Sequence, residues 1–112
     1  MQSSRWDAQG NVYLVTTEPL MPERVRAEVG DADGILEVLG SGDDWVEIRI
    51  WNPDGSRAEM SGNGTRIAAR WHGGNAVTVR VGPLASDGAA ESLCNSLKAR
   101  RIQCQVLRSA NK

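Results

Sequence analysis

The chain has 112 residues, 40% of them apolar, which suits a single domain with one core. Its formal net charge of −1 gives no general attraction to nucleic acid or to an anionic membrane, and no apolar run approaches the roughly 18 residues of a membrane span. The first ten residues lack the apolar stretch of a secretory signal, so we expect a cytoplasmic protein. Two cysteines and one histidine, without a Cys-x-x-Cys pair, predict neither a disulfide framework nor a metal site.

The first predicted elements are a strand, a short helix and a second strand. The β-branched run at 12–16 is typical of a strand. Pro22 suits the first turn of a helix, in which Val25 and Val29 share one face. A second strand is predicted at 35–39, where the chain reads ILEVL, closed by the glycines that follow it.

The next elements are a strand, a turn and the longest predicted helix. Alternation at 46–50 predicts a half-buried strand, with Trp45 and Trp51 on its polar face, so that face is expected to be covered in part. Residues 53–55 read Pro-Asp-Gly and predict a turn. The helix after Gly62 is predicted to bury one face and to stop at the next glycine pair; these positions are Ile67, Ala68, Trp71, Gly73 and Gly74.

A change in composition divides the chain near residue 83. Residues 1–83 carry eight basic and twelve acidic side chains, whereas residues 84–112 carry five basic and two acidic ones. Before the division, valines alternate at 77–81 and predict a last strand. Beyond it, the spacing of apolar residues predicts a helix followed by a strand at 102–106.

The segment at 52–70 reads NPDGSRAEMSGNGTRIAAR and leads from a strand end through a turn to the start of a helix. Unpaired N–H groups and the positive end of the helix dipole suit such a start to holding a carboxylate. The segment resembles the signature of diaminopimelate epimerases, in which a DGS turn leads to an AEMCGNG-type helix start. Similar pieces at 9–13 (QGNVY, against Gly-Asn-Asp-Phe/Tyr) and 33–36 (DGIL) follow the family order.

The resemblance covers residues 5–83 and implies an α/β (α+β) fold. It predicts a diaminopimelate-epimerase-like domain at 1–83, with a curved mixed sheet wrapped around a central helix, and a tail of unrelated sequence at 84–112. Members of the family have two such domains and bind their amino acid in the cleft between them. Epimerisation there needs no cofactor, because one cysteine from each half removes or returns the α-proton. The resemblance thus implies an isomerase of lysine and peptidoglycan-precursor biosynthesis.

Carried over residue by residue, the resemblance assigns five site residues. Asn11 and Asn52 would hydrogen-bond the substrate, and the backbone of Gly62 and Asn63 would hold its α-carboxylate. Ser61 stands at the position of the first catalytic cysteine. A helix start lowers the pKa of a thiol from about 8.5 toward neutrality, but a hydroxyl is far less acidic, and neither His nor Lys neighbours Ser61 in the sequence. With the second half and its cysteine also lacking, we expect a truncated half without full activity.

Other interpretations of these residues stay open. Residues 61–64 also suit a plain helix cap, and Asn52 also suits a turn of its own. The chain would then be a non-catalytic domain that binds an amino acid or another carboxylate, or a homodimer whose two copies imitate the two-domain cleft. In a third alternative Glu59 transfers the proton, although an extended chain points it away from Ser61. Cys94 is predicted to be a buried, inert thiol.

Overall fold

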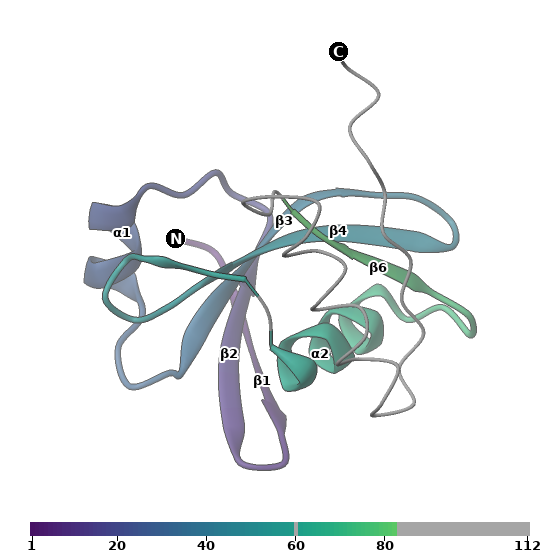
Figure 1. Cartoon of the computed structure of the whole chain (residues 1–112), viewed down its shortest axis with the longest axis horizontal. Helices are drawn as coiled ribbons and strands as arrows, with labels where there is room; N and C mark the ends of the chain where they lie inside the picture. The colour runs from purple at the N-terminus through teal and green to yellow at the C-terminus, as the bar shows by residue number, and fades with distance from the viewer. Residues whose placement is uncertain (60, 83–112) are drawn as a thin grey trace. The chain divides into compact units, whose positions relative to one another are not determined.

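The fold is built on an open sheet in which parallel and antiparallel strands are mixed (Figure 1). The computed structural model describes residues 1–59 and 61–82. In this part of the chain the elements follow the order β1 (Ser4–Ala8), β2 (Asn11–Thr16), α1 (Pro22–Glu28), β3 (Gly34–Ser41), β4 (Trp45–Trp51), β5 (Arg57–Ala58), α2 (Gly62–His72) and β6 (Thr78–Val81).

Strand β4 organises the sheet because it pairs along both of its edges. On one side the order is β1, β2, β3, with β2 and β3 parallel and the other two pairings antiparallel. On the other side two short strands share β4: β5 pairs with Ile50 and Trp51, and β6 runs parallel to residues 45–48. This mixture of directions confirms the predicted α+β class.

The two faces of the sheet pack against different helices. Successive residues of a strand point to opposite faces, so Leu36 and Ile50 pack with residues of α2, whereas Ile35 and Trp51 pack with residues of α1. Helix α2 contacts β1, β2, β3, β4 and β6, so it packs across one face of the sheet. The predicted cover over Trp51 is confirmed, since only 4% of this residue is exposed.

Helix α2 begins and ends where the sequence predicted. Ser61 is its N-cap and accepts from the Gly64 N–H, and Gly73 closes it in the left-handed conformation with φ of 85°. Ile67 and Ala68 are buried against the sheet. The last residue, His72, is half-buried, and its Nε2 lies 2.5 Å from the Gly42 carbonyl oxygen. This contact ties the end of α2 to the β3–β4 loop.

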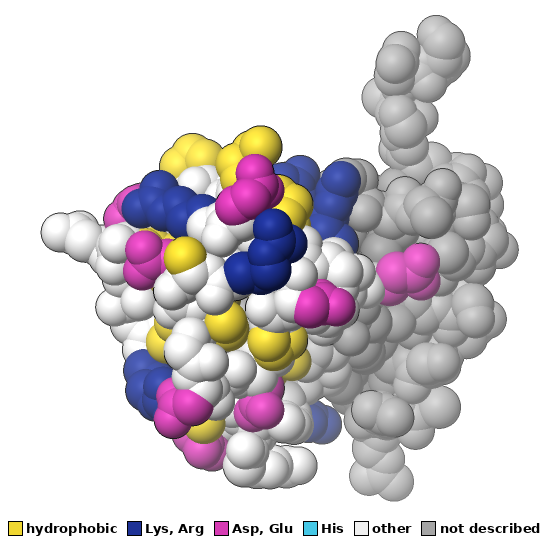
Figure 2. All heavy atoms as spheres, turned by 90° about the vertical axis from the view of Figure 1, so that its left-hand side faces the viewer, with side chains coloured by type: hydrophobic (Ala, Val, Ile, Leu, Met, Phe, Trp, Pro, Cys, Tyr) yellow, Lys and Arg dark blue, Asp and Glu magenta, His cyan; other side chains and the backbone are white. Residues whose placement is uncertain are grey.

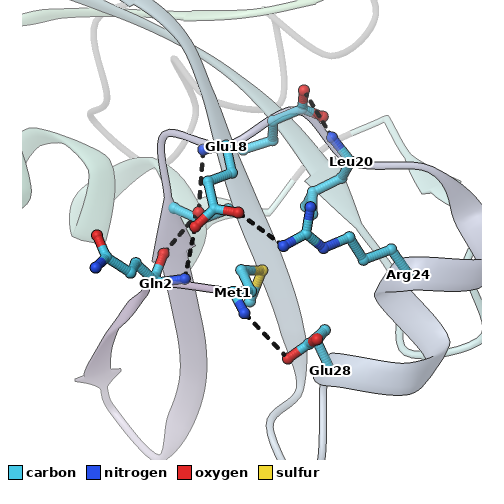
Figure 3. A network of polar contacts seen from close by, with 8 residues as sticks. Met1, Gln2, Glu18, Leu20, Arg24 and Glu28 are labelled. Atoms are coloured by element: carbon cyan, nitrogen blue, oxygen red, sulfur yellow. Dashed lines mark hydrogen bonds and ion pairs between the residues drawn. The ribbon is translucent and has the colours of Figure 1, made fainter.

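Helix α1 is short and is held mainly by its buried face. Pro22 occupies the first turn, and Val25 and Val29, which were predicted to share one face, are both buried. Figure 3 shows how the segment before α1 is fixed: the Glu18 carboxylate accepts from the Gln2 N–H at 2.6 Å and from Arg24 at 2.7 Å. The Gln2 N–H, with the Arg24 charge, holds the pKa of Glu18 below its ordinary value. The stability this carboxylate adds is therefore present above its unfolded pKa and is lost as the pH falls through its folded pKa.

Two strands were not predicted. Strand β1 reads SRWDA, is mostly exposed and lacks apolar alternation, so its sequence carries no strand signal. It forms because the next two residues make a tight hairpin, with φ of 53° at Gln9 and 88° at Gly10, which pairs Ala8 with Asn11. Strand β5 has only two residues. Strand β3 also runs further than predicted, to Ser41, with a register shift between Val38 and Gly40.

The tail elements predicted beyond residue 83 lie outside the described residues. Within the described part, no helix is both long enough and apolar enough to cross a membrane. The face shown in Figure 2 carries acidic and basic side chains interspersed with apolar ones, with no continuous basic stripe.

The ring of Tyr13 lies against Gly34 of β3, and replacement of this glycine should lower the stability of the fold. A Cβ at Gly34 would lie 2.5 Å from the Trp51 carbonyl oxygen and 2.8 Å from the Tyr13 ring. We expect Gly34→Ala to lower the free energy of unfolding by about 1–3 kcal/mol in urea titration, because ring and backbone must move apart. Gly40→Ala in the same strand is the control, since its Cβ would meet only Trp45, at 3.4 Å. Equal losses in both variants would contradict the steric account.

Candidate functional site

Two donors converge on the Ser61 hydroxyl at the start of α2. Its Oγ accepts from the Gly64 N–H and from the Tyr13 hydroxyl, each at 2.9 Å. Tyr13 comes from β2, is only 9% exposed and reaches Ser61 across Gly34. A serine hydroxyl has two acceptor positions and one proton. Both acceptor positions are thus occupied, and Ser61 keeps its own proton to donate.

The helix starts tightly because Gly64 has no side chain. A Cβ there would lie 3.1 Å from the Ser61 Cβ and 3.3 Å from Leu36 of β3. The absence of that atom lets the first turn of α2 sit directly on the sheet, beside the strand that also supports Tyr13. The position of Ser61 is thus set by core packing as well as by its cap.

Two asparagines meet beside this turn. The Asn63 Nδ2 donates to the Asn11 Oδ1, which joins the first turn of α2 to the first residue of β2. On its other side the Asn63 Oδ1 accepts from Arg66 at 3.0 Å. Both asparagines are partly exposed, so their remaining polar atoms can reach a ligand.

Two of the first four backbone amides of α2 have no acceptor in the described part of the chain. The Gly64 N–H is satisfied by the Ser61 side chain and the Thr65 N–H by the Ser61 carbonyl. Among the residues that the structure describes, none accepts from the N–H of Gly62 or of Asn63. These two N–H groups lie at the positive end of the helix dipole, where a carboxylate is stabilised.

Asn52 occupies a separate turn after β4. Its carbonyl accepts from the Gly55 N–H, and its Nδ2 donates to the Ser56 Oγ at 3.0 Å. Gly55 has φ of 87°, as the Pro-Asp-Gly pattern predicted. In the described part of the chain no hydrogen bond connects Asn52 with Asn11, Ser61 or Asn63. The structure therefore brings together four of the five predicted site residues and places Asn52 in the turn role that was its alternative.

The sequence is similar to one family of known proteins over most of its length. A sequence model of the family described as diaminopimelate epimerase matches residues 12–91. The chain belongs to the diaminopimelate epimerase family. It is 38% identical over 82 residues to diaminopimelate epimerase 2 of Nostoc sp. (63% of this chain, 29% of that protein). It is also 40% identical over 83 residues to diaminopimelate epimerase of Corynebacterium aurimucosum (54% of this chain, 29% of that protein).

A shorter match of higher identity is with diaminopimelate epimerase of Moorella thermoacetica, 52% identical over 40 residues, or 36% of this chain and 14% of that protein. The chain spans less than a third of the length of these relatives. The similarity therefore covers the N-terminal part of such an enzyme.

The contacts of two residues around this site were not predicted from the sequence. Tyr13 lies in the motif at 9–13, but nothing in a linear motif shows that its hydroxyl reaches Ser61 across another strand. Arg66 follows Asn63 by three residues on a helix, a spacing that places two side chains side by side. Its contact could thus have been found from helical spacing.

The hydrogen bonds of the turn that contains Asn52 can be tested through the pKa of Asp54. Asp54 accepts from the Ser56 hydroxyl at 2.6 Å and from the Ser56 N–H at 2.9 Å, and these bonds lower the pKa of Asp54 below its ordinary value. Removal of the hydroxyl in Ser56→Ala should raise the pKa of Asp54, measured by NMR titration of its carboxyl carbon. Ser41→Ala should leave it unchanged. An Asp54 pKa that is the same in both variants would show that Ser56 does not stabilise the carboxylate.

Proposed function

We propose that this chain is the N-terminal half of an amino-acid epimerase and that it binds the α-carboxylate of diaminopimelate or a related amino acid at the start of α2. The observation that carries the proposal is the group of donors around residue 61. The N–H groups of Gly62 and Asn63, which have no acceptor among residues 1–59 and 61–82, and the side chain of Asn11 lie beside it. In the proposal Asn52 joins them from the neighbouring turn when ligand is bound.

A donor-rich helix start suits the chemistry of epimerisation. Removal of an α-proton leaves a carbanion whose charge spreads into the carboxylate, so donors at the carboxylate stabilise the transition state. The group that moves the proton must be a base, and at position 61, where the family has its first catalytic cysteine, this chain has a serine. A serine hydroxyl is far less acidic than a thiol, so in the proposal Ser61 does not serve as that base.

The proposal divides activity between two halves. Residues 1–83 form the half with the carboxylate site, and the other face of the cleft comes from sequence that the longer relatives possess. The length of the relatives, of which the chain spans 29%, supports this division. By itself the chain is proposed to bind its ligand without epimerising it.

A ligand titration tests the proposal in the chain as it stands. Diaminopimelate is titrated into isotope-labelled protein, and the backbone amide resonances of Gly62 and Asn63 are expected to shift, while the α-hydrogen of the ligand is retained in heavy water. Ser61→Asp should abolish the shifts, because aspartate is a good N-cap but fills the site with negative charge. Ser41→Asp, an exposed serine at the end of β3, is the matched control.

Three outcomes contradict the proposal. The carboxylate site is wrong if the two amide resonances do not respond to millimolar ligand, or if Ser61→Asp and Ser41→Asp bind equally well. Exchange of the α-hydrogen by the unaltered chain would instead show that the chain carries a competent base of its own.

A further inference from the structure

Three side chains form a continuous set of hydrogen bonds that ends at the proposed ligand site. Arg66 donates to the Asn63 Oδ1, and the Asn63 Nδ2 donates to the Asn11 Oδ1. We call this set the amide chain. Among the described residues, none accepts from the Asn11 Nδ2. Within the described part of the chain, the amide chain therefore ends in an –NH₂ group without an acceptor.

Arg66 determines the direction of the whole set. A guanidinium can only donate, so the carboxamide of Asn63 must turn its oxygen toward Arg66. Its –NH₂ group is then directed at Asn11, which must accept this hydrogen bond through its own oxygen. If either amide were reversed, two donors or two acceptors would face each other and a hydrogen bond would be lost. One cation on the helix surface thus fixes which end of Asn11 is left for a ligand.

We infer that Arg66 is a positioning residue that makes Asn11 present donors, so that the site selects a group that only accepts hydrogen bonds, namely a carboxylate. The inference rests on the proposed function for its ligand. It adds that selectivity is set one helical turn away from the ligand, by a residue that need not touch it. Two effects of Arg66 are separable, because its charge attracts anions at long range whereas its hydrogen bond only orients Asn63.

Two neutral variants separate orientation from charge. Arg66→Gln removes the charge but keeps an –NH₂ donor for the Asn63 oxygen. Arg66→Met removes the charge and the donor while keeping a long side chain. Arg70→Met is the matched charge control, since Arg70 lies one turn further along α2 and contacts the Asp7 carbonyl and the Trp6 ring instead of Asn63.

The first measurement needs no ligand. The side-chain –NH₂ resonances of Asn11 and Asn63 are followed in the full labelled chain. In the unaltered protein, Arg70→Met and Arg66→Gln, the Asn63 resonances are expected to show slowed hydrogen exchange. In Arg66→Met this protection should be lost. Equal protection in Arg66→Met and Arg70→Met would overturn the inference.

The second measurement uses sodium acetate as the probe. Its dissociation constant, from the shifts of the Asn11 –NH₂ resonances, should be about threefold to tenfold weaker in Arg66→Met than in Arg66→Gln. Equal affinities in these two variants would leave only an effect of charge and would overturn the inference. If acetate shifts no resonance in any protein while the exchange results hold, the orientation by Arg66 stands and the proposed carboxylate site fails.

Discussion

Replacement of Ser61 by cysteine is expected to create a thiol with a pKa well below the usual value of about 8.5. The reason lies in the two donors that already converge on the serine oxygen, the Gly64 N–H and the Tyr13 hydroxyl, and in the dipole of α2. Each stabilises the thiolate more than the neutral thiol. The pKa follows from the pH dependence of thiolate absorbance, taken as a difference from the unaltered chain, which retains Cys94 and Cys104.

The control for this variant is a cysteine at an exposed serine away from any helix start. Ser41→Cys, at the end of β3, should titrate with an ordinary thiol pKa. Adding Tyr13→Phe to Ser61→Cys should raise the pKa of the introduced thiol, since one of its donors is removed. Equal pKa values for Ser61→Cys and Ser41→Cys would show that the start of α2 does not stabilise an anion at this position.

The largest loss of stability is expected when Glu37 is replaced by alanine. This carboxylate is 5% exposed and accepts from the Trp51 Nε1 at 2.9 Å and from the Leu20 N–H at 3.4 Å. It also pairs with Arg49 at 3.6 Å, directly across the β3–β4 ladder. Glu37→Ala would leave these donors and a partly buried positive charge without a partner, at a cost of about 3–5 kcal/mol in the free energy of unfolding.

Urea unfolding followed by tryptophan fluorescence measures this loss. Glu37→Gln is the informative control, because its amide oxygen still accepts from Trp51 while the charge is removed. We expect it to lose less stability than Glu37→Ala. If both variants were as stable as the unaltered chain, the buried carboxylate would not contribute to the fold.

The parts of the fold that sequence could predict are those in which a local pattern and burial agree. Alternation at 46–50 correctly predicted strand β4, and the glycine after His72 correctly predicted the end of α2. Both features depend only on residues that are close together in the sequence. Strand β1 could not be found in this way. Its residues are mostly exposed, and it is a strand because the Gln9–Gly10 turn returns the chain onto β2.

The site was predictable to the extent that it lies in one continuous segment. The motif at 52–70 located the helix start, and resemblance singled out Asn11 although it is distant in sequence. The hydroxyl of Tyr13 escaped prediction because its contact with Ser61 depends on the packing of β2, β3 and α2 together. Asn52 shows the converse: a motif residue whose hydrogen bonds in this structure stay within its own turn.

The division of the far edge of β4 between β5 and β6 has a consequence for synthesis of the chain. On this edge, residues 45–48 can pair with β6 only when residues 78–81 have left the ribosome, after α2 is complete. Until then, a length of β4 backbone with buried valine and isoleucine beside it stays open to pairing with another molecule. A released chain that ends between residues 73 and 77 should accordingly aggregate, whereas one that extends through residue 82 should not.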